Sequence, residues 1–210
     1  MHVVVRNPPS GTERAVVAWD VDATMWDFHR AFYDACREIH VHLPEDPPDG
    51  EVTWRWVCDR IGHENAVAVL PKVHTADWMV RYGPLPGAVE ATHAVRAAGA
   101  RVVVMTHRPP DTAADTVRFL DQAGFHWDEL RVGADCKVTA CGAMGATVII
   151  DDMPFTLERA VAGGMEALTI AWPHNAEIRA GGRVRHAPDY AGLLPQILAA
   201  VERAATARVT

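Results

Sequence analysis

The chain has 210 residues, of which 49% are hydrophobic and 22% are charged, and its formal net charge is −7 at neutral pH. This is an ordinary globular composition, which excludes fibrous and intrinsically disordered classes. The apolar runs are far shorter than the ~18 residues needed to cross a bilayer, and an acidic chain without a basic cluster argues against a nucleic-acid polymer as partner. The length suits one domain, or one domain that carries a smaller insert.

The N-terminal segment and the cysteines indicate the compartment. No basic stretch followed by a long apolar core is present near Met1, so the segment is not a secretory signal. The four cysteines form no C-x-x-C pair, and their irregular spacing suits free thiols in a reducing environment. We therefore expect a cytoplasmic protein without a membrane partner. The sequence leaves the oligomeric state open, with a homodimer as one candidate.

Short β-branched runs alternate with helical patterns along most of the chain, which is typical of a parallel sheet covered by helices. The predicted strands are residues 15–19, 101–105, 130–132, 147–150 and 168–171. Helical spacing over 88–95 and 113–120 ends at Gly99 and Gly124, and a closing helix follows Asp189 as its cap. The pattern predicts an α/β fold, a Rossmann-like three-layer parallel sheet.

A long segment between the first two predicted strands contains helical patterns and no convincing strand. Apolar residues recur at helical spacing from Phe28 to Ile39 behind Asp27, and again from Trp54 to Ile61 behind Thr53. Two more helices are predicted over 64–70 and 75–82, with proline-rich stretches at 44–48 and 83–87. We predict a helical cap at 28–83, inserted into a core made of 1–27 and 84–210.

Polar residues follow each of the predicted core strands. Because ligands of open α/β sheets bind at the carboxyl ends of the strands, these residues are the candidate site. They are Asp20, Asp22 and Thr24 after the first strand, Thr106, His107 and Arg108 after the second, Lys137 after the third, and Asp151 and Asp152 after the fourth. Four aspartates gathered there would repel one another at neutral pH unless a cation neutralised them, and oxygen ligands favour Mg²⁺.

These motifs resemble the four motifs of the haloacid dehalogenase superfamily of phosphatases. The resemblance rests on D-x-D-x-T at Asp20–Thr24, an apolar run ending in Thr106, the isolated Lys137, and the pair Asp151-Asp152, in that order. Each motif alone is weak, since a lone D-x-D is usually a solvated turn or a cap. Lys137 alone would be read as a solvated surface lysine, and Asp151-Asp152 as caps of the next helix. The ordered set indicates phosphoryl transfer.

The resemblance implies a role for each motif residue. Asp20 would attack phosphorus and form an aspartyl-phosphate, and Asp22 would serve as general acid and then base. Thr106 and Lys137 would hold the phosphoryl oxygens. Magnesium would be held by Asp20, the backbone carbonyl of Asp22 and Asp152. Asp151 would lie next to these ligands without binding the ion directly. One departure is Ala23, where the family usually has glycine. The substrate would be a small phosphorylated metabolite.

The inserted helices resemble the type one cap of this superfamily. The short cap and Trp172-Pro173-His174-Asn175 resemble the 5′-nucleotidase and deoxyribonucleotidase-type branch, which would make nucleoside monophosphates the substrates. For the substrate side we expect contributions from Thr24, Trp26, His29, Trp56, His107 and Arg108. Trp54 lies on the apolar stripe of its helix and is read as core, whereas Trp56 lies off it and marks either recognition or an oligomer contact.

Several other functions compete with this interpretation. A sugar phosphate or phospho-acid phosphatase, or a protein that binds phosphorylated ligands without turnover, would have the same motifs. A metal-free carbon–halogen hydrolase would leave Asp22 and Asp152 as unpaired negative charge. A receiver-type signalling module carries its paired acids first in the chain, the reverse of the order here. Zinc at His40-Val41-His42 lacks further ligands in the sequence.

Overall fold

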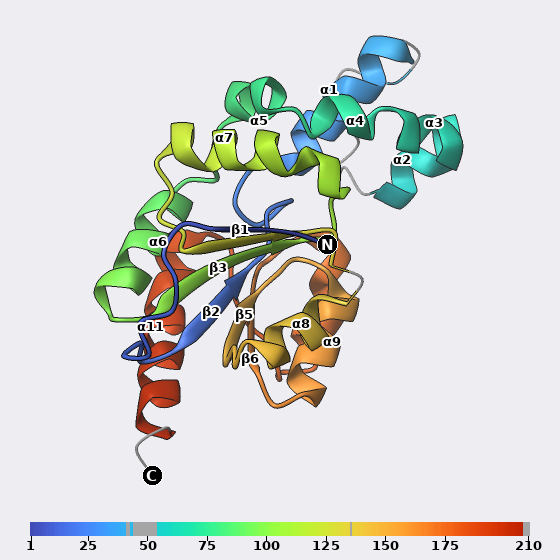
Figure 1. Cartoon of the computed structure of the whole chain (residues 1–210). Coiled ribbons are helices and arrows are strands. Elements are labelled where there is room, and N and C mark those ends of the chain that lie inside the picture. Colours follow the sequence, from blue (N-terminus) through green and yellow to red (C-terminus); the bar gives the residue numbers. More distant parts are fainter. Residues whose placement is uncertain (41–42, 44–53, 135, 208–210) are drawn as a thin grey trace.

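The computed structural model describes residues 1–40, 43, 54–134 and 136–207. Its centre is a seven-stranded sheet in the order β1-β4-β3-β2-β5-β6-β7, in which only β1 runs antiparallel to its neighbour (Figure 1). The strands are β1 (His2–Val5), β2 (Val16–Trp19), β3 (Arg101–Thr106), β4 (Glu129–Val132), β5 (Val148–Ile150), β6 (Glu166–Ile170) and β7 (Arg185–Ala187). The predicted α/β fold is confirmed.

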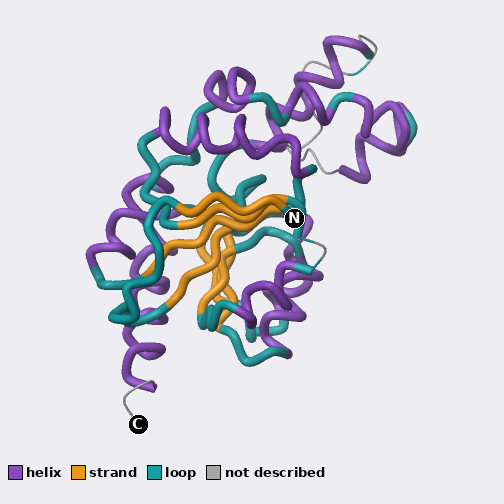
Figure 2. The backbone as a smooth tube through the Cα atoms, in the orientation of Figure 1, coloured by secondary structure: helices purple, strands orange, loops and turns teal. Residues whose placement is uncertain are grey.

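Helices lie on both faces of the sheet, which gives three layers (Figure 2). The helices after β3 are η2 (Pro110–Thr112), α7 (Ala113–Ala123), α8 (Lys137–Ala143), α9 (Pro154–Ala162), η3 (Pro173–Asn175), α10 (Ala176–Ala180) and α11 (Tyr190–Ala207). Before β3 the chain forms α1 (Phe28–Ile39), α2 (Trp54–Ile61), α3 (His63–Ala68), α4 (Leu70–Val73), α5 (Ala76–Tyr82) and α6 (Ala88–Ala97).

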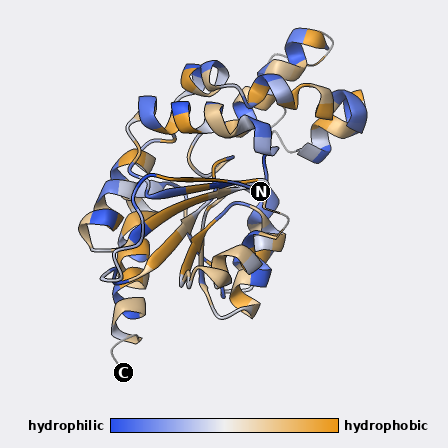
Figure 3. Ribbon diagram, in the orientation of Figure 1, coloured by the Kyte–Doolittle hydropathy of each residue, from blue (hydrophilic) through white to orange (hydrophobic). Residues whose placement is uncertain are grey.

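The central strands are apolar on both faces because helices cover both. In β2, Val17 and Trp19 face the core shared with α6, α7 and α11, while Val16 and Ala18 face the core shared with α8 and α9. Figure 3 shows the strands in hydrophobic colours and the helices with mixed faces. Trp19 also supports the loop that follows β2. Its indole N–H donates to the Tyr190 hydroxyl, which in turn donates to the carbonyl of Thr24 in that loop.

The helices α1 to α5 follow β2 and lie beyond its carboxyl end in Figure 1. The chain enters this helical segment at Met25 and leaves it at Leu85. These two points are hydrogen-bonded, because the backbone N–H of Leu85 donates to the carbonyl of Met25 at 2.9 Å. Helix α5 packs on α7, and α1 packs on α4 and α5. One continuous apolar cluster joins these helices to the sheet. The division at residues 28 and 83 stays a prediction.

Two strands were not predicted. The run at β1 forms by antiparallel pairing with β4, and β7 pairs with β6 although its residues are Arg185, His186 and Ala187. The predicted bounds 28–39 and 54–61 agree with α1 and α2, while the proline-rich stretch 44–48 and the cap Thr53 lie outside the described residues. The four cysteines are free thiols. Within the described segments, no helix combines the length and apolarity required to span a bilayer.

Candidate active site

The loop after β2 brings Asp20 to the junction of three strands. Its backbone N–H donates to the carbonyl of Ile150 at 2.9 Å, so β2 stays paired with β5 up to the carboxylate itself. The chain then turns through Ala23, the only non-glycine among the described residues with a positive φ, at 55°. A left-handed conformation costs an alanine about 1 kcal/mol, which explains why glycine suits this position.

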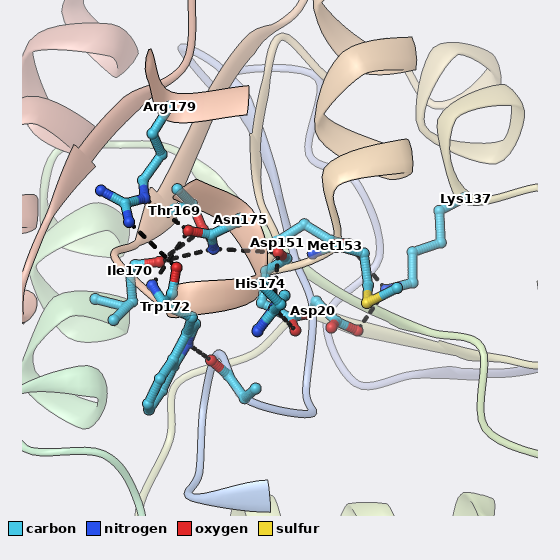
Figure 4. Close-up of polar contacts among 12 residues, drawn as sticks. Asp20, Lys137, Asp151, Met153, Thr169, Ile170, Trp172, His174, Asn175 and Arg179 are labelled. Atoms are coloured by element: carbon cyan, nitrogen blue, oxygen red, sulfur yellow. Dashed lines mark hydrogen bonds and ion pairs between the residues drawn. The ribbon is translucent and has the colours of Figure 1, made fainter. Parts of the chain in front are cut away.

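Lys137 lies between two carboxylates. As the first residue of α8 it is buried, and its Nζ is 2.5 Å from Asp20 Oδ1 and 2.8 Å from Asp151 Oδ2 (Figure 4). Burial opposes its charge, yet the two carboxylates outweigh burial and raise the pKa of Lys137 above its usual value. The lysine is therefore a permanent cation that fixes the orientation of Asp20.

Three carboxylates converge beside this lysine. Oxygen atoms of Asp20, Asp151 and Asp152 lie within 4.8 Å of one another, and all three residues are buried. Burial, opposed by Lys137 and reinforced by the neighbouring acids, raises the pKa of Asp20 well above its usual value. Burial likewise raises the pKa of Asp152. Such a set of hard oxygen donors, with more negative charge than Lys137 neutralises, fits a divalent cation such as Mg²⁺.

Thr106 ends β3 and is buried next to this group. Its Oγ1 accepts a hydrogen bond from the backbone N–H of Arg108 at 3.2 Å, which orients the hydroxyl at the strand end. Because β3 and β5 flank β2, the three strand ends place Thr106, Asp20 and Asp151 at one edge of the sheet. This is the edge at which the sequence predicted them to meet.

Asp22 faces a different partner. The guanidinium group of Arg108 and the indole N–H of Trp26 both donate to its carboxylate, at 2.5 to 2.9 Å. Although burial favours the neutral acid, the charge and hydrogen bonds of Arg108 hold the pKa of Asp22 well below its usual range. In this conformation Asp22 is an ionised carboxylate outside the three-aspartate cluster.

A cavity of about 750 Å³ opens over these groups. Its polar floor consists of Asp20, Asp22, Thr106, Arg108, Lys137 and Asp152. Its opposite wall is aromatic: Phe28 stacks on Phe32 at 5.6 Å between ring centroids, and Phe32 stacks on Trp54 at 5.1 Å. The volume suits a small metabolite.

Three residues expected on the substrate side lie elsewhere. Trp26 is fully buried, packs against Phe119 and bonds Asp22, so it supports the floor instead of lining the entrance. Thr24 is buried within the loop after β2 and does not line the cavity. Trp56 packs on Tyr33 and under Arg60, whereas Trp54, read as core, lines the cavity. The apolar stripe of α2 contacts both the core and the cavity. Helical periodicity identifies the stripe but does not tell which of its residues line the cavity.

Two expected residues and two unexpected ones also line the cavity. His29 and His107 do so as predicted. His74 was not singled out, and His174 was named only within the tetrapeptide after the last predicted strand, not as a site residue. The rule of strand ends, applied to β6 as to the other strands, makes His174 a candidate site residue; no sequence signal marks His74. Burial, with the nearby His174 adding to it, lowers the pKa of His29 to about 4, so its imidazole is neutral at pH 7.

The turn at η3 holds His174 against Asp152. The Nε2 of His174 is 2.9 Å from Asp152 Oδ2. The side-chain amide of Asn175 donates to the Asp152 carbonyl and to Thr169 Oγ1. The indole N–H of Trp172 donates to the carbonyl of Ala23 at 2.7 Å (Figure 4). These bonds join the loop after β6 to the loops that carry Asp20 and Asp152.

No protein-family model and no curated protein matches this chain by sequence. Solved structures match its fold. A haloacid dehalogenase family hydrolase from Deinococcus radiodurans, with bound phosphate and sodium, superposes with a TM-score of 0.60 at 18% identity, over 90% of this chain and 97% of that one. A putative phosphoglycolate phosphatase from Lactobacillus delbrueckii subsp. bulgaricus gives 0.61 at 14% identity, over 88% and 98%.

An L-2-haloacid dehalogenase gives a TM-score of 0.54 at 17% identity, over 87% of this chain and 99% of that one. At these identities the likeness establishes the fold, and this fold carries both phosphatases and a dehalogenase. The choice of reaction must therefore come from the side chains of the site.

Proposed function

We propose that this chain, whose fold is that of the haloacid dehalogenase-like hydrolases, is a Mg²⁺-dependent phosphomonoesterase that acts on a small phosphorylated metabolite. The observation that carries the proposal is the Asp20 carboxylate on the floor of the cavity, oriented by Lys137 at 2.5 Å. Asp152 lines the same floor, and Asp151 lies next to both in the three-aspartate cluster. A nucleophile, a fixed cation and a cluster of hard oxygen donors in one cavity are what phosphoryl transfer requires.

In the proposed reaction a carboxylate oxygen of Asp20 attacks phosphorus, and the bond from phosphorus to the leaving oxygen breaks. The product is an aspartyl-phosphate on Asp20 and an alcohol whose oxygen takes up a proton. Water then attacks the phosphorus, which releases inorganic phosphate and restores the carboxylate. Lys137 and the Thr106 hydroxyl stabilise the charge on the phosphoryl oxygens through both steps.

The cation would be held by Asp20, Asp152 and, by family resemblance, the backbone carbonyl of Asp22. Asp151 lies beside this set, where its carboxylate accepts hydrogen bonds from Lys137 and the Met153 N–H. Magnesium bound there supplies the positive charge that lets a phosphate dianion approach three aspartates. The same acids count against a metal-free dehalogenase, because without a divalent cation Lys137 would offset only part of their negative charge in a buried site.

Asp22 is the proposed proton carrier, and its ion pair defines when it can act. With Arg108 bound it is ionised and suited to accept a proton from the attacking water. To donate a proton to the leaving oxygen it must first lose some of that ion pair. The incoming phosphate dianion competes for the Arg108 guanidinium, which lines the same cavity. We propose that this competition makes Asp22 a proton donor only when substrate is bound.

The aromatic wall guides the proposal for the substrate. Phe28, Phe32 and Trp54 offer a stacking surface to the leaving group, which suits the base of a nucleoside monophosphate. A sugar phosphate or phospho-acid would use Arg55 and His107 at the same cavity instead. A cytoplasmic location and a homodimer stay predictions.

The test is a phosphate-release screen with Mg²⁺ over nucleoside monophosphates, sugar phosphates and phospho-acids, together with a small aryl phosphate. We expect release from the aryl phosphate and a preference for one metabolite class. If no compound is hydrolysed while calorimetry detects binding of inorganic phosphate, the chain is a non-catalytic phospho-ligand protein. Halide release from a haloacid without Mg²⁺ would overturn the phosphatase proposal.

A further inference from the structure

A second group of metal-ligand types lies beside the three-aspartate cluster. His29, Asp152 and His174 each place one ligand atom within 4.8 Å of the other two. They come from separate elements: His29 from the first turn of α1, Asp152 from the loop after β5, and His174 from η3. All three line the cavity, so an ion from solvent can reach them.

His29 supplies an independent observation. Its Nε2 atom is buried and has no hydrogen-bond partner in the structure. A buried ring nitrogen without a partner costs about 1–3 kcal/mol, so such atoms usually have a ligand or serve a function. The second ring, His174, lies at 5.1 Å between centroids and points its Nε2 at Asp152. A ring nitrogen of His29 therefore lies within 4.8 Å of ligand atoms of both His174 and Asp152, and the Nε2 of the same ring is unpartnered.

The surroundings hold these side chains in place. The ring of His29 packs edge-on against Trp172 at 5.0 Å, and the Trp172 indole is fixed by its bond to the carbonyl of Ala23. Asn175 secures the backbone of Asp152 and the turn that carries His174. Ligand atoms about 2.1 Å from a common tetrahedral ion lie roughly 3.4 Å apart. The observed ligand atoms lie within 4.8 Å of one another.

We propose that His29 Nε2, His174 Nε2 and a carboxylate oxygen of Asp152 form a second divalent-cation site, selective for imidazole-preferring transition metals such as Zn²⁺ or Co²⁺. Its donor set separates it from the oxygen-only cluster, which suits Mg²⁺. Asp152 belongs to both sets and would bridge the two ions. The site does not depend on the proposed reaction, since metal binding is measured without substrate.

The test uses tag-free, metal-depleted protein in excess Mg²⁺, which occupies the oxygen cluster, titrated with Co²⁺ and followed by visible absorption. We expect one Co²⁺ per chain with the d–d bands of a nitrogen-ligated ion. His29→Asn and His174→Asn should each weaken Co²⁺ binding at least tenfold. Circular dichroism of each variant reports that it is folded, and either variant alone decides the outcome.

The matched control is the double variant His93→Asn/His126→Asn. These rings also face each other, at 5.9 Å between centroids, near Asp128, yet they do not belong to a converging ligand group in the described part of the chain. Native-like Co²⁺ binding by this control supports the site. Retained binding in a folded His29→Asn or His174→Asn variant, equal loss in the control, or no Co²⁺ binding by the native chain below about 100 μM overturns it. None of these outcomes bears on phosphate release.

Discussion

The guanidinium group of Arg108 donates two hydrogen bonds to the carboxylate of Asp22, at 2.9 Å from Nε and 2.5 Å from Nη2. The arginine side chain is 1% exposed, and its remaining nitrogen contacts Met79 of α5 and Thr116 of α7. The pair thus connects the loop after β2 to two helices that pack on each other.

Breaking this pair should destabilise the fold. Arg108→Met leaves Asp22 largely buried without a cation, so we expect a loss of about 3 kcal/mol in the free energy of unfolding, measured with urea. The double variant Asp22→Asn/Arg108→Met should lose less than the two single losses summed. As a control, Arg118→Met removes the exposed ion pair with Asp77 and should cost at most about 1 kcal/mol. Equal losses for both arginines would contradict the structural role.

Asp20→Asn should abolish turnover without loss of stability. An amide is a poor nucleophile, so we expect kcat to fall at least about a thousandfold. Lys137 keeps its partner Asp151 at 2.8 Å, and a buried charge is removed, so the melting temperature should stay the same or rise. The variant Asp128→Asn should behave in the opposite way. Asp128 is buried far from the cavity and accepts a hydrogen bond from the Val102 N–H, so its replacement should lower the melting temperature and leave kcat unchanged. Full activity in Asp20→Asn would exclude Asp20 as nucleophile.

Chelation should abolish the proposed phosphatase activity. After dialysis against EDTA we expect phosphate release to fall at least about a hundredfold and to return with Mg²⁺, because the acids otherwise repel a phosphate dianion. Mg²⁺ should also raise the melting temperature of the native chain, and less so that of Asp152→Asn. Hydrolysis that persists in EDTA would favour the metal-free alternative.

The aromatic wall makes a prediction for two tryptophans of one helix. If the substrate is a nucleoside monophosphate, Trp54→Ala removes a stacking surface worth ~1–3 kcal/mol and should raise KM by roughly 5–150-fold. A small aryl phosphate that does not reach Trp54 should keep its KM. Trp56→Ala, on the same helix but packed on Tyr33 outside the cavity, is the matched control. If both variants change KM alike, the stacking proposal fails while the phosphatase proposal stands.

His74 should make the fold sensitive to acid. Burial, with Asp22 opposing it and Arg108 adding to it, lowers the pKa of His74 from 6.5 to about 4. The unfolded chain then binds the proton first, so stability falls as the pH drops from 6.5 towards 4. Between pH 7 and 4.5 this amounts to about 2–3 kcal/mol, which His74→Asn should remove from the urea-unfolding profile. His2→Asn, at an exposed position of β1, should leave the profile unchanged.

The positions of the strand ends were predictable because the central strands are apolar and end abruptly in polar residues. Asp20, Thr106 and Asp151 meet for that reason, and α1 begins at Phe28 because Asp27 accepts the N–H of Arg30 at 3.1 Å. Both are local signals. They determine which residues reach the sheet edge and where a helix starts.

What could not be predicted depends on contacts between distant segments. The strand β7 exists through pairing with β6, not through β propensity of Arg185 and His186. Nothing in the sequence distinguishes Trp26 and Trp56 from an aromatic residue that lines a cavity. Their positions depend on contacts with Asp22 and Tyr33, respectively. Likewise, the ion pair of Asp22 with Arg108 joins residues 86 positions apart, which no local pattern reveals.

The hydrogen bond from Leu85 to Met25 has a consequence for how this protein can diversify. In terms of chain entropy, the segment between these two residues is a single loop whose two ends are held together by this hydrogen bond. The entropy of closing a flexible loop grows only with the logarithm of its length, about 0.6 kcal/mol for each doubling. Loop closure alone therefore adds little free-energy cost when this segment gains or loses residues away from the apolar cluster that joins it to the sheet. The proposed phosphatase could accept new leaving groups in this way while the aspartates below keep their positions.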